Sequence, residues 1–246
     1  LKLPSIDRLK WCLECVITAS KMVDAGVELQ NEAQRTVFHK VLGAFKDAQD
    51  ILRVLPPRTE DAVRFYTFLV SFVVRVRTLR VKEYLLLPVL WVDEQDLEHC
   101  ILCLVTKHTE ETYCNYSLTI VNASTTINSG LEYHPPSIDT ITGEVRRKLS
   151  ITFRNIPDDR IQNTAFWYLF FRPAVCNVRS DAKFVYEKIC PFLTDMHALS
   201  AVQAELQDPR NADDFRSLPQ NGDSSLVYAL FECARVIAKN DGMEPI

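Results

Sequence analysis

The chain is poor in the residues and patterns on which several large classes of protein depend. Its 246 residues include only six glycines, and none of them forms the glycine-rich loop that cradles phosphate groups. The strongly apolar, uncharged stretch of residues 65–74 is too short to span a bilayer. The first residues also lack the apolar core of a secretory signal. These absences argue against a nucleotide-binding loop, a membrane span and a signal peptide.

A cluster of positive charge is missing as well. The net charge is −4, and lysine and arginine are scattered along the chain, so no basic face for nucleic acid is predicted. The densest basic group, Arg75, Arg77, Arg80 and Lys82, would lie on more than one side of a helix. The composition, with 47% hydrophobic and 24% charged residues, is that of a globular chain that can bury one large core or two small ones.

The eight cysteines do not resemble a disulfide framework, because most of them sit within apolar segments. We predict buried free thiols and a reducing, cytoplasmic location. Cys100 and Cys103 are spaced like metal ligands, but residues three apart on a strand point to opposite faces. Cys12 and Cys15 share a helix face but lack a second pair at metal-site spacing. We therefore predict no metal and no cofactor.

Two apolar runs, residues 99–107 and 113–122, carry the main structural and functional pattern. Both are rich in residues that suit a pleated surface, and a polar turn joins them, so they predict an antiparallel hairpin. His99 opens the first strand and Asn122 closes the second, which places both at the same edge of the sheet. Because side chains alternate along a strand, His99 and Cys100 point to opposite faces.

Further strands are predicted at residues 84–92 and 148–155. Pro88 makes the first an edge strand or one broken at the proline. Helices are predicted over residues 6–27, 31–55, 60–79, 159–171, 182–193 and 223–239. The helix over 60–79 is apolar nearly all round, so we expect it to lie buried behind the sheet. Pro173 is expected to stop the helix before it.

These elements predict an α+β fold. We expect a small antiparallel sheet packed on a long buried helix, flanked by N-terminal and C-terminal helical layers. The pair of prolines at Pro56 and Pro57 suggests a boundary. Residues 1–57 would form an N-terminal helical hairpin, and residues 58–246 an α+β core with C-terminal helices. The chain reads as a domain excised from a longer intracellular protein.

The order of elements, together with the loop sequence Asn-Ser-Gly-Leu-x-Tyr-His at residues 128–134, resembles a eukaryotic papain-like cysteine peptidase core over residues 84–238. The resemblance implies that His99 is the base, Asn122 its orienting partner and Gln220 an oxyanion donor. Ser225 then stands where a cysteine would begin the last helix. A serine hydroxyl keeps its proton far more tightly than a thiol, so the resemblance implies a dead or very weak enzyme.

Other interpretations remain open. In the plainest one, His99 is a solvated strand start, Asn122 begins a turn and the residues before the last helix form an ordinary N-cap. In another, Cys100 or a different thiol makes the chain a hydrolase of peptide or isopeptide bonds, such as ubiquitin conjugates. We favour a non-catalytic interaction or scaffold module with a degenerate peptidase-like site. Its partners would be other protein chains or domains of the parent protein, with no nucleic acid and no membrane.

Overall fold

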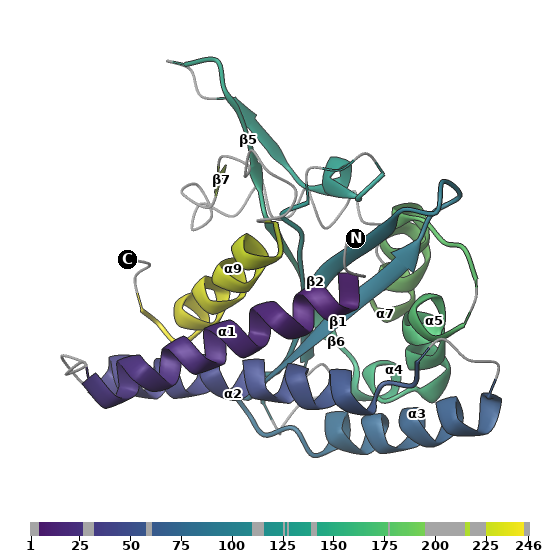
Figure 1. The fold of residues 1–246 in the computed structure, drawn as a ribbon, viewed down its shortest axis with the longest axis horizontal. Helices are drawn as coiled ribbons and strands as arrows, with labels where there is room; N and C mark the ends of the chain where they lie inside the picture. The colour runs from purple at the N-terminus through teal and green to yellow at the C-terminus, as the bar shows by residue number, and fades with distance from the viewer. Residues whose placement is uncertain are drawn as a thin grey trace.

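The structure is a computed structural model, in which an antiparallel sheet has helices on both faces (Figure 1). It describes residues 5–26, 32–57, 61–109, 116–124, 126, 128–138, 142–176, 178–194, 215–216 and 225–243. The predicted α+β class is confirmed. Among the helices of these residues, none combines the length and the apolar character that crossing a bilayer requires.

The main sheet has four strands in the order β1-β2-β3-β6. Their bounds are β1 (Tyr84–Val92), β2 (Glu98–Lys107), β3 (Tyr116–Val121) and β6 (Ser150–Ile156). β1 is an edge strand, as Pro88 predicts, because proline has no N–H to donate to a ladder. The β1–β2 register runs without a shift from Tyr84 opposite Thr106 to Val92 opposite Glu98. This regular register fixes which way each side chain of β2 points.

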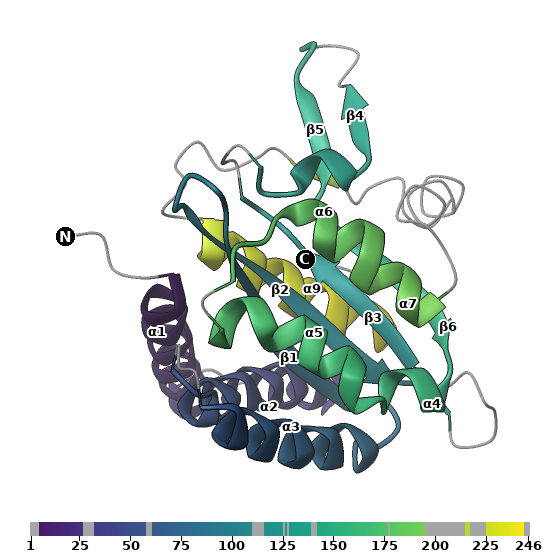
Figure 2. The same ribbon diagram turned by 90° about the vertical axis from the view of Figure 1, so that its right-hand side faces the viewer.

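The two faces of this sheet are covered by different helices. His99, Ile101 and Cys103 lie on one face, which we call the His99 face, and Cys100, Leu102 and Leu104 lie on the other, the Cys100 face. The register places Ser150 on the Cys100 face, where its hydroxyl donates to Glu232 of α9 (Ser225–Asn240) at 2.7 Å. The His99 face is covered by α5 (Thr164–Val175) and by the helical turns of residues 182–194. Figure 2 shows these segments in front of the sheet and α9 behind it.

The N-terminal helices join the same core. α1 (Ser5–Gly26) and α2 (Glu32–Val54) pack on each other, and α2 also packs along β1. Leu9 and Leu13 of α1 are fully buried within the same cluster of apolar side chains as the strands. The helical hairpin predicted for residues 1–57 therefore shares its buried surface with the sheet.

α3 (Ala62–Arg77) does not occupy the central position that its sequence suggested. It lies at the periphery of the molecule (Figures 1 and 2) and packs on α5, where Phe72 meets Trp167 and Phe171 edge to face. Asp61 caps it by accepting a hydrogen bond from the backbone N–H of Arg64. The sequence suggested a buried helix because apolar residues lie on both of its sides, but in the structure the apolar residues of the outer side are exposed.

Two predicted helices are divided in the structure. The helix predicted over 159–171 is split into α4 (Asp158–Ile161) and α5, because the side chain of Asn163 caps a new helix at Ala165. Pro173 was wrongly expected to end the helix, since it lies inside α5. Residues 182–194 form α6 (Ala182–Phe184), the π-helical turn η2 (Val185–Ile189) and α7 (Cys190–Thr194).

A second, smaller sheet was not predicted. It has the order β4-β5-β7, with β4 (Pro136–Ile138), β5 (Val145–Lys148) and β7 (Phe215–Arg216). β4 and β5 project from the body of the molecule (Figure 2). The short turn η1 (Leu131–Tyr133) precedes them. These strands have only two to four residues each, which is too short for a pattern of alternation to reveal them.

Candidate functional site

The most distinctive polar group on the His99 face is a buried pair, Asp93 and His99. The Nε2 atom of His99 lies 2.9 Å from Oδ2 of Asp93, and both side chains are buried. The ring of Trp91 stacks on the imidazole with a centroid distance of 5.1 Å. Trp91 and His99 are directly opposite each other in the β1–β2 ladder, so the hairpin itself brings these two rings together.

Asp93 is held by the turn that joins β1 to β2. Its Oδ1 atom accepts hydrogen bonds from the backbone N–H groups of Gln95 and Leu97, each at 2.9 Å. Burial opposes ionisation of the carboxyl group, but the hydrogen bonds from His99, Leu97 and Gln95 outweigh it and lower the pKa of Asp93. The group is therefore a carboxylate at neutral pH, and it acts only as an acceptor.

This carboxylate sets the orientation of the imidazole. Because Asp93 only accepts, the Nε2 atom of His99 must carry the proton and donate it. The Nδ1 atom, which remains the basic nitrogen of a neutral ring, lies 3.5 Å from the exposed hydroxyl of Thr126. The hydroxyl of Thr126 is in turn 2.9 Å from that of Ser124. A line of polar groups thus runs from the buried carboxylate to the surface.

Asn122 lies at the same end of the sheet as His99, as predicted, because Val121 pairs with Leu102. Its amide, however, serves the loop that follows. It donates to the carbonyl of Ser129 at 2.8 Å, accepts from the backbone N–H of Ser124 at 2.9 Å, and hydrogen-bonds Tyr186. The partner that orients His99 is therefore Asp93 rather than Asn122. Sequence reasoning missed Asp93, although it stands where β1 enters a turn six residues before His99.

The structure does not place Ser225 beside the imidazole. Ser225 is the first residue of α9, and α9 packs on the Cys100 face through Glu232, whereas His99 points to the other face. Gln220 lies outside the described residues. The predicted grouping of His99, Asn122 and Ser225 in one cleft therefore fails for a physical reason: the strand register and the helix place the base and the hydroxyl on opposite sides of the sheet.

The buried thiols do not replace that serine as an activated group. Cys100 points away from His99 in an unbroken register, and burial raises the pKa of its thiol to about 12. Burial also raises the pKa of Cys103, Cys190 and Cys233. Every cysteine in the described residues is a free thiol. No group of three or more His, Cys, Asp or Glu side chains in that part of the chain could hold a metal ion.

The loop of residues 128–134, whose sequence resembles that of a papain-like peptidase, has a structural role. His134 is fully buried; its Nδ1 donates to the carbonyl of Lys148 at 2.8 Å, and its Nε2 accepts from the hydroxyl of Tyr186 at 2.7 Å. Burial lowers the pKa of His134 to about 4, so the ring is neutral. Tyr133 stacks on Tyr186 with a centroid distance of 4.6 Å and donates to Glu187. The loop is thereby fastened to η2.

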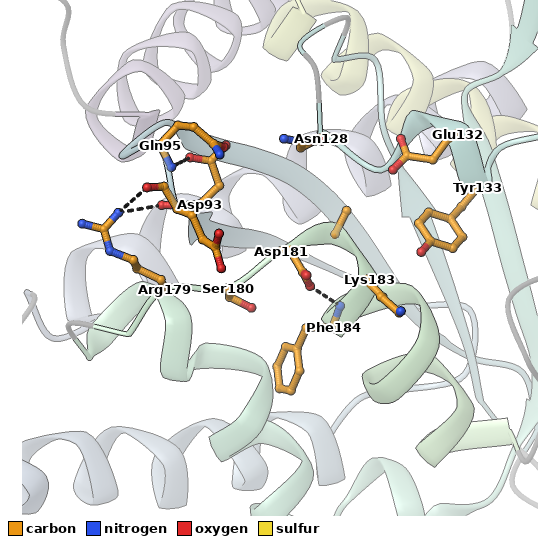
Figure 3. Close-up of a pocket in the computed structure, with 12 residues that line it drawn as sticks. Asp93, Gln95, Asn128, Glu132, Tyr133, Arg179, Ser180, Asp181, Lys183 and Phe184 are labelled. Carbon is orange, nitrogen blue, oxygen red and sulfur yellow. Dashed lines mark hydrogen bonds between the residues drawn. The ribbon is translucent and has the colours of Figure 1, made fainter.

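A cavity of about 540 Å³ lies beside the Asp93 turn (Figure 3). Arg179 borders it and donates to the carbonyls of Asp93 and Glu94 at 3.0 and 3.1 Å. Asp181, which also lines the cavity, caps α6 by accepting from the backbone N–H of Phe184 at 2.7 Å. A second cavity of about 500 Å³ includes Trp91 and His99 in its lining.

Comparisons of the chain with protein-family models, with curated proteins and with solved structures found no match.

Proposed function

We propose that this chain is a non-catalytic protein-interaction module. The observation that carries the proposal is the outer side of α3, where four large apolar side chains are exposed: Val63 by 76%, Tyr66 by 63%, Val70 by 43% and Val74 by 51%. They recur at intervals of three and four residues, so they form one continuous row along the helix. Exposed apolar rows of this kind mark surfaces that bind other proteins.

The groups around His99 support a structural role for the imidazole. Asp93 closes the β1–β2 turn, and His99 and Trp91 complete its packing. An activated thiol needs a lowered pKa, which electropositive and partly exposed surroundings produce. Burial raises the pKa of Cys100 and Cys103, and these thiols stay protonated at neutral pH. The partners would be other protein chains or domains of the parent protein.

A thiol hydrolase of peptide or isopeptide bonds is the second candidate. The Asp93–His99 pair favours it, because a carboxylate that holds one ring nitrogen leaves the other free to act as a base. In this case a cysteine from elsewhere in the chain would have to reach Nδ1 of His99. The two candidates differ in whether any thiol reacts in a manner that depends on His99.

One experiment addresses both candidates. The full chain is treated with peptide and ubiquitin probes that carry a thiol-reactive group, beside a His99→Ala variant. In parallel, the mass of the natively purified complex is measured for the wild type and for Val70→Asp. We expect no labelling that depends on His99, and a smaller complex for Val70→Asp with an unchanged melting temperature. Labelling of one cysteine that disappears in His99→Ala would establish the hydrolase instead.

A further inference from the structure

We infer that the outer row of α3 binds an amphipathic helix of another protein, and that the apolar side of this helix continues into acidic residues over the C-terminal end of α3. This inference rests on the proposed function and names the partner of its binding surface. It begins from the sequence of the helix. Val63, Tyr66, Val70 and Val74 are followed at the next position of the same row by Arg77, which is exposed.

The spacing of the row favours a helix as the occupant. From Val63 to Arg77 the row spans 15 residues of regular helix, which is about 21 Å at 1.5 Å per residue. Ridges of side chains three and four residues apart pack into the grooves of a second helix with the same spacing. The opposite side of α3 is buried against the core through Phe65, Phe68 and Phe72, so α3 is a fixed platform.

The charges around α3 indicate which end of this helix faces the acidic residues of the partner. The helix itself contains no acidic residue. At its C-terminal end Arg77, Arg80 and Lys82 are exposed, and none of their side-chain charges meets a carboxylate among the described residues. The neighbouring Arg75 differs, because Asp47 and Glu83 pair with it. Near the other end, Asp61 is the N-cap of the helix. A partner with carboxylates over Arg77 and its neighbours would meet three exposed cations at that end, whereas the described residues at the N-terminal end of α3 offer one, Arg64.

The arrangement of these charges argues against a lipid surface. A helix that lies in a membrane interface has basic residues along its polar flanks and a wide apolar side. Here Thr67 and Ser71 border the middle of the apolar row, and most of the exposed basic residues gather at and after the last turn of α3. A protein helix with an apolar row and one acidic end matches this pattern better.

The test places a photo-reactive p-benzoylphenylalanine at Val70 of the full-length protein in its own cells and maps the captured segment by mass spectrometry. The same residue at Lys46, exposed on α2, is the control position. We expect capture of one helical segment with acidic residues within a turn of its apolar contacts. Charge reversal by Arg77→Glu with Arg80→Glu should lower the yield by about tenfold, whereas Arg35→Glu on α2 should leave it unchanged.

The outcomes separate this inference from the proposed function. The inference would be overturned if Val70 captured a second copy of the chain or a segment without acidic residues. It would also be overturned if the charge reversal left the yield unchanged. In each case the chain would remain an interaction module. Capture of lipid would also overturn the inference, and anionic vesicles that bind the wild type but not Val70→Asp would confirm that result. No capture at Val70, together with thiol labelling that depends on His99, would overturn both.

Discussion

Two buried histidines on the same side of the molecule have opposite surroundings. His134 lies between a backbone carbonyl and the hydroxyl of Tyr186, which hold its neutral form and seal it from solvent. His99 lies against the carboxylate of Asp93, and its second nitrogen approaches an exposed hydroxyl. The comparison shows that burial alone does not mark a functional histidine. The chemistry of its partners decides whether the ring fastens a loop or could exchange a proton.

The largest expected effect tests how tightly the loop of residues 128–134 packs against η2. Gly130 has φ +86°, and an added Cβ would lie 2.6 Å from the ring of Tyr186. We expect Gly130→Ala to lower the free energy of unfolding by about 4 kcal/mol, through strain and overpacking together. Gly143→Ala is the matched control, since it has φ +71° but open space around it, and should cost about 1 kcal/mol. If urea denaturation gave equal losses in the free energy of unfolding for the two variants, Gly130 would not be packed against Tyr186 as described.

The next effect is a pH dependence of stability that His134 should produce. Its pKa is about 4 in the folded protein and 6.5 ordinarily, because burial opposes the charged ring. The unfolded chain therefore takes up a proton between these values while the folded protein does not, so stability is full above pH 6.5 and falls towards pH 4. The loss is about 3 kcal/mol. The difference between the wild type and His134→Gln, measured by denaturation across this range, should show it, and a difference that does not vary with pH would contradict it.

A smaller effect is expected at the His99 pair. Asp93→Ala removes the acceptor of three hydrogen bonds and should lower the free energy of unfolding by about 2 kcal/mol. Asp93→Asn keeps an acceptor for the turn and should recover about half of this loss. Because the pKa of Asp93 is lowered, its contribution should be present above the ordinary value of 3.8 and vanish in acid. If Asp93→Ala has the melting temperature of the wild type, the Asp93–His99 pair does not stabilise the turn between β1 and β2.

The smallest effect compares the two hydroxyls that approach the rings. Thr126 is exposed and lies 3.5 Å from His99, so Thr126→Val should change stability by less than about 0.5 kcal/mol. Tyr186→Phe removes a buried hydroxyl 2.7 Å from His134 and should cost about 1 kcal/mol or more. Thermal melting of both variants measures the contrast. A loss at Thr126 as large as that at Tyr186 would mean that the two rings are held alike.

Much of the fold follows from local pattern. The strand predicted over 84–92 is β1 to the residue, and of the two outcomes that Pro88 predicted, an edge strand or a broken one, the structure has the edge strand. The strand predicted over 99–107 matches β2 to within one residue at its start. The site was harder to predict. His99 and the direction of Cys100 follow from alternation along a strand, but Asp93 meets His99 only because the turn between β1 and β2 folds back.

The sequence by itself determined the α+β class, most of the strands and helices, and the shared sheet end of His99 and Asn122, because hydrophobic period and turn residues act over a few neighbours. Only the tertiary structure decided that α9 covers the face away from His99, that Asp93 orients the imidazole, and that α3 turns an apolar row to the surface. Those outcomes depend on which helix packs on which face, and that choice is made by contacts between residues far apart in the chain.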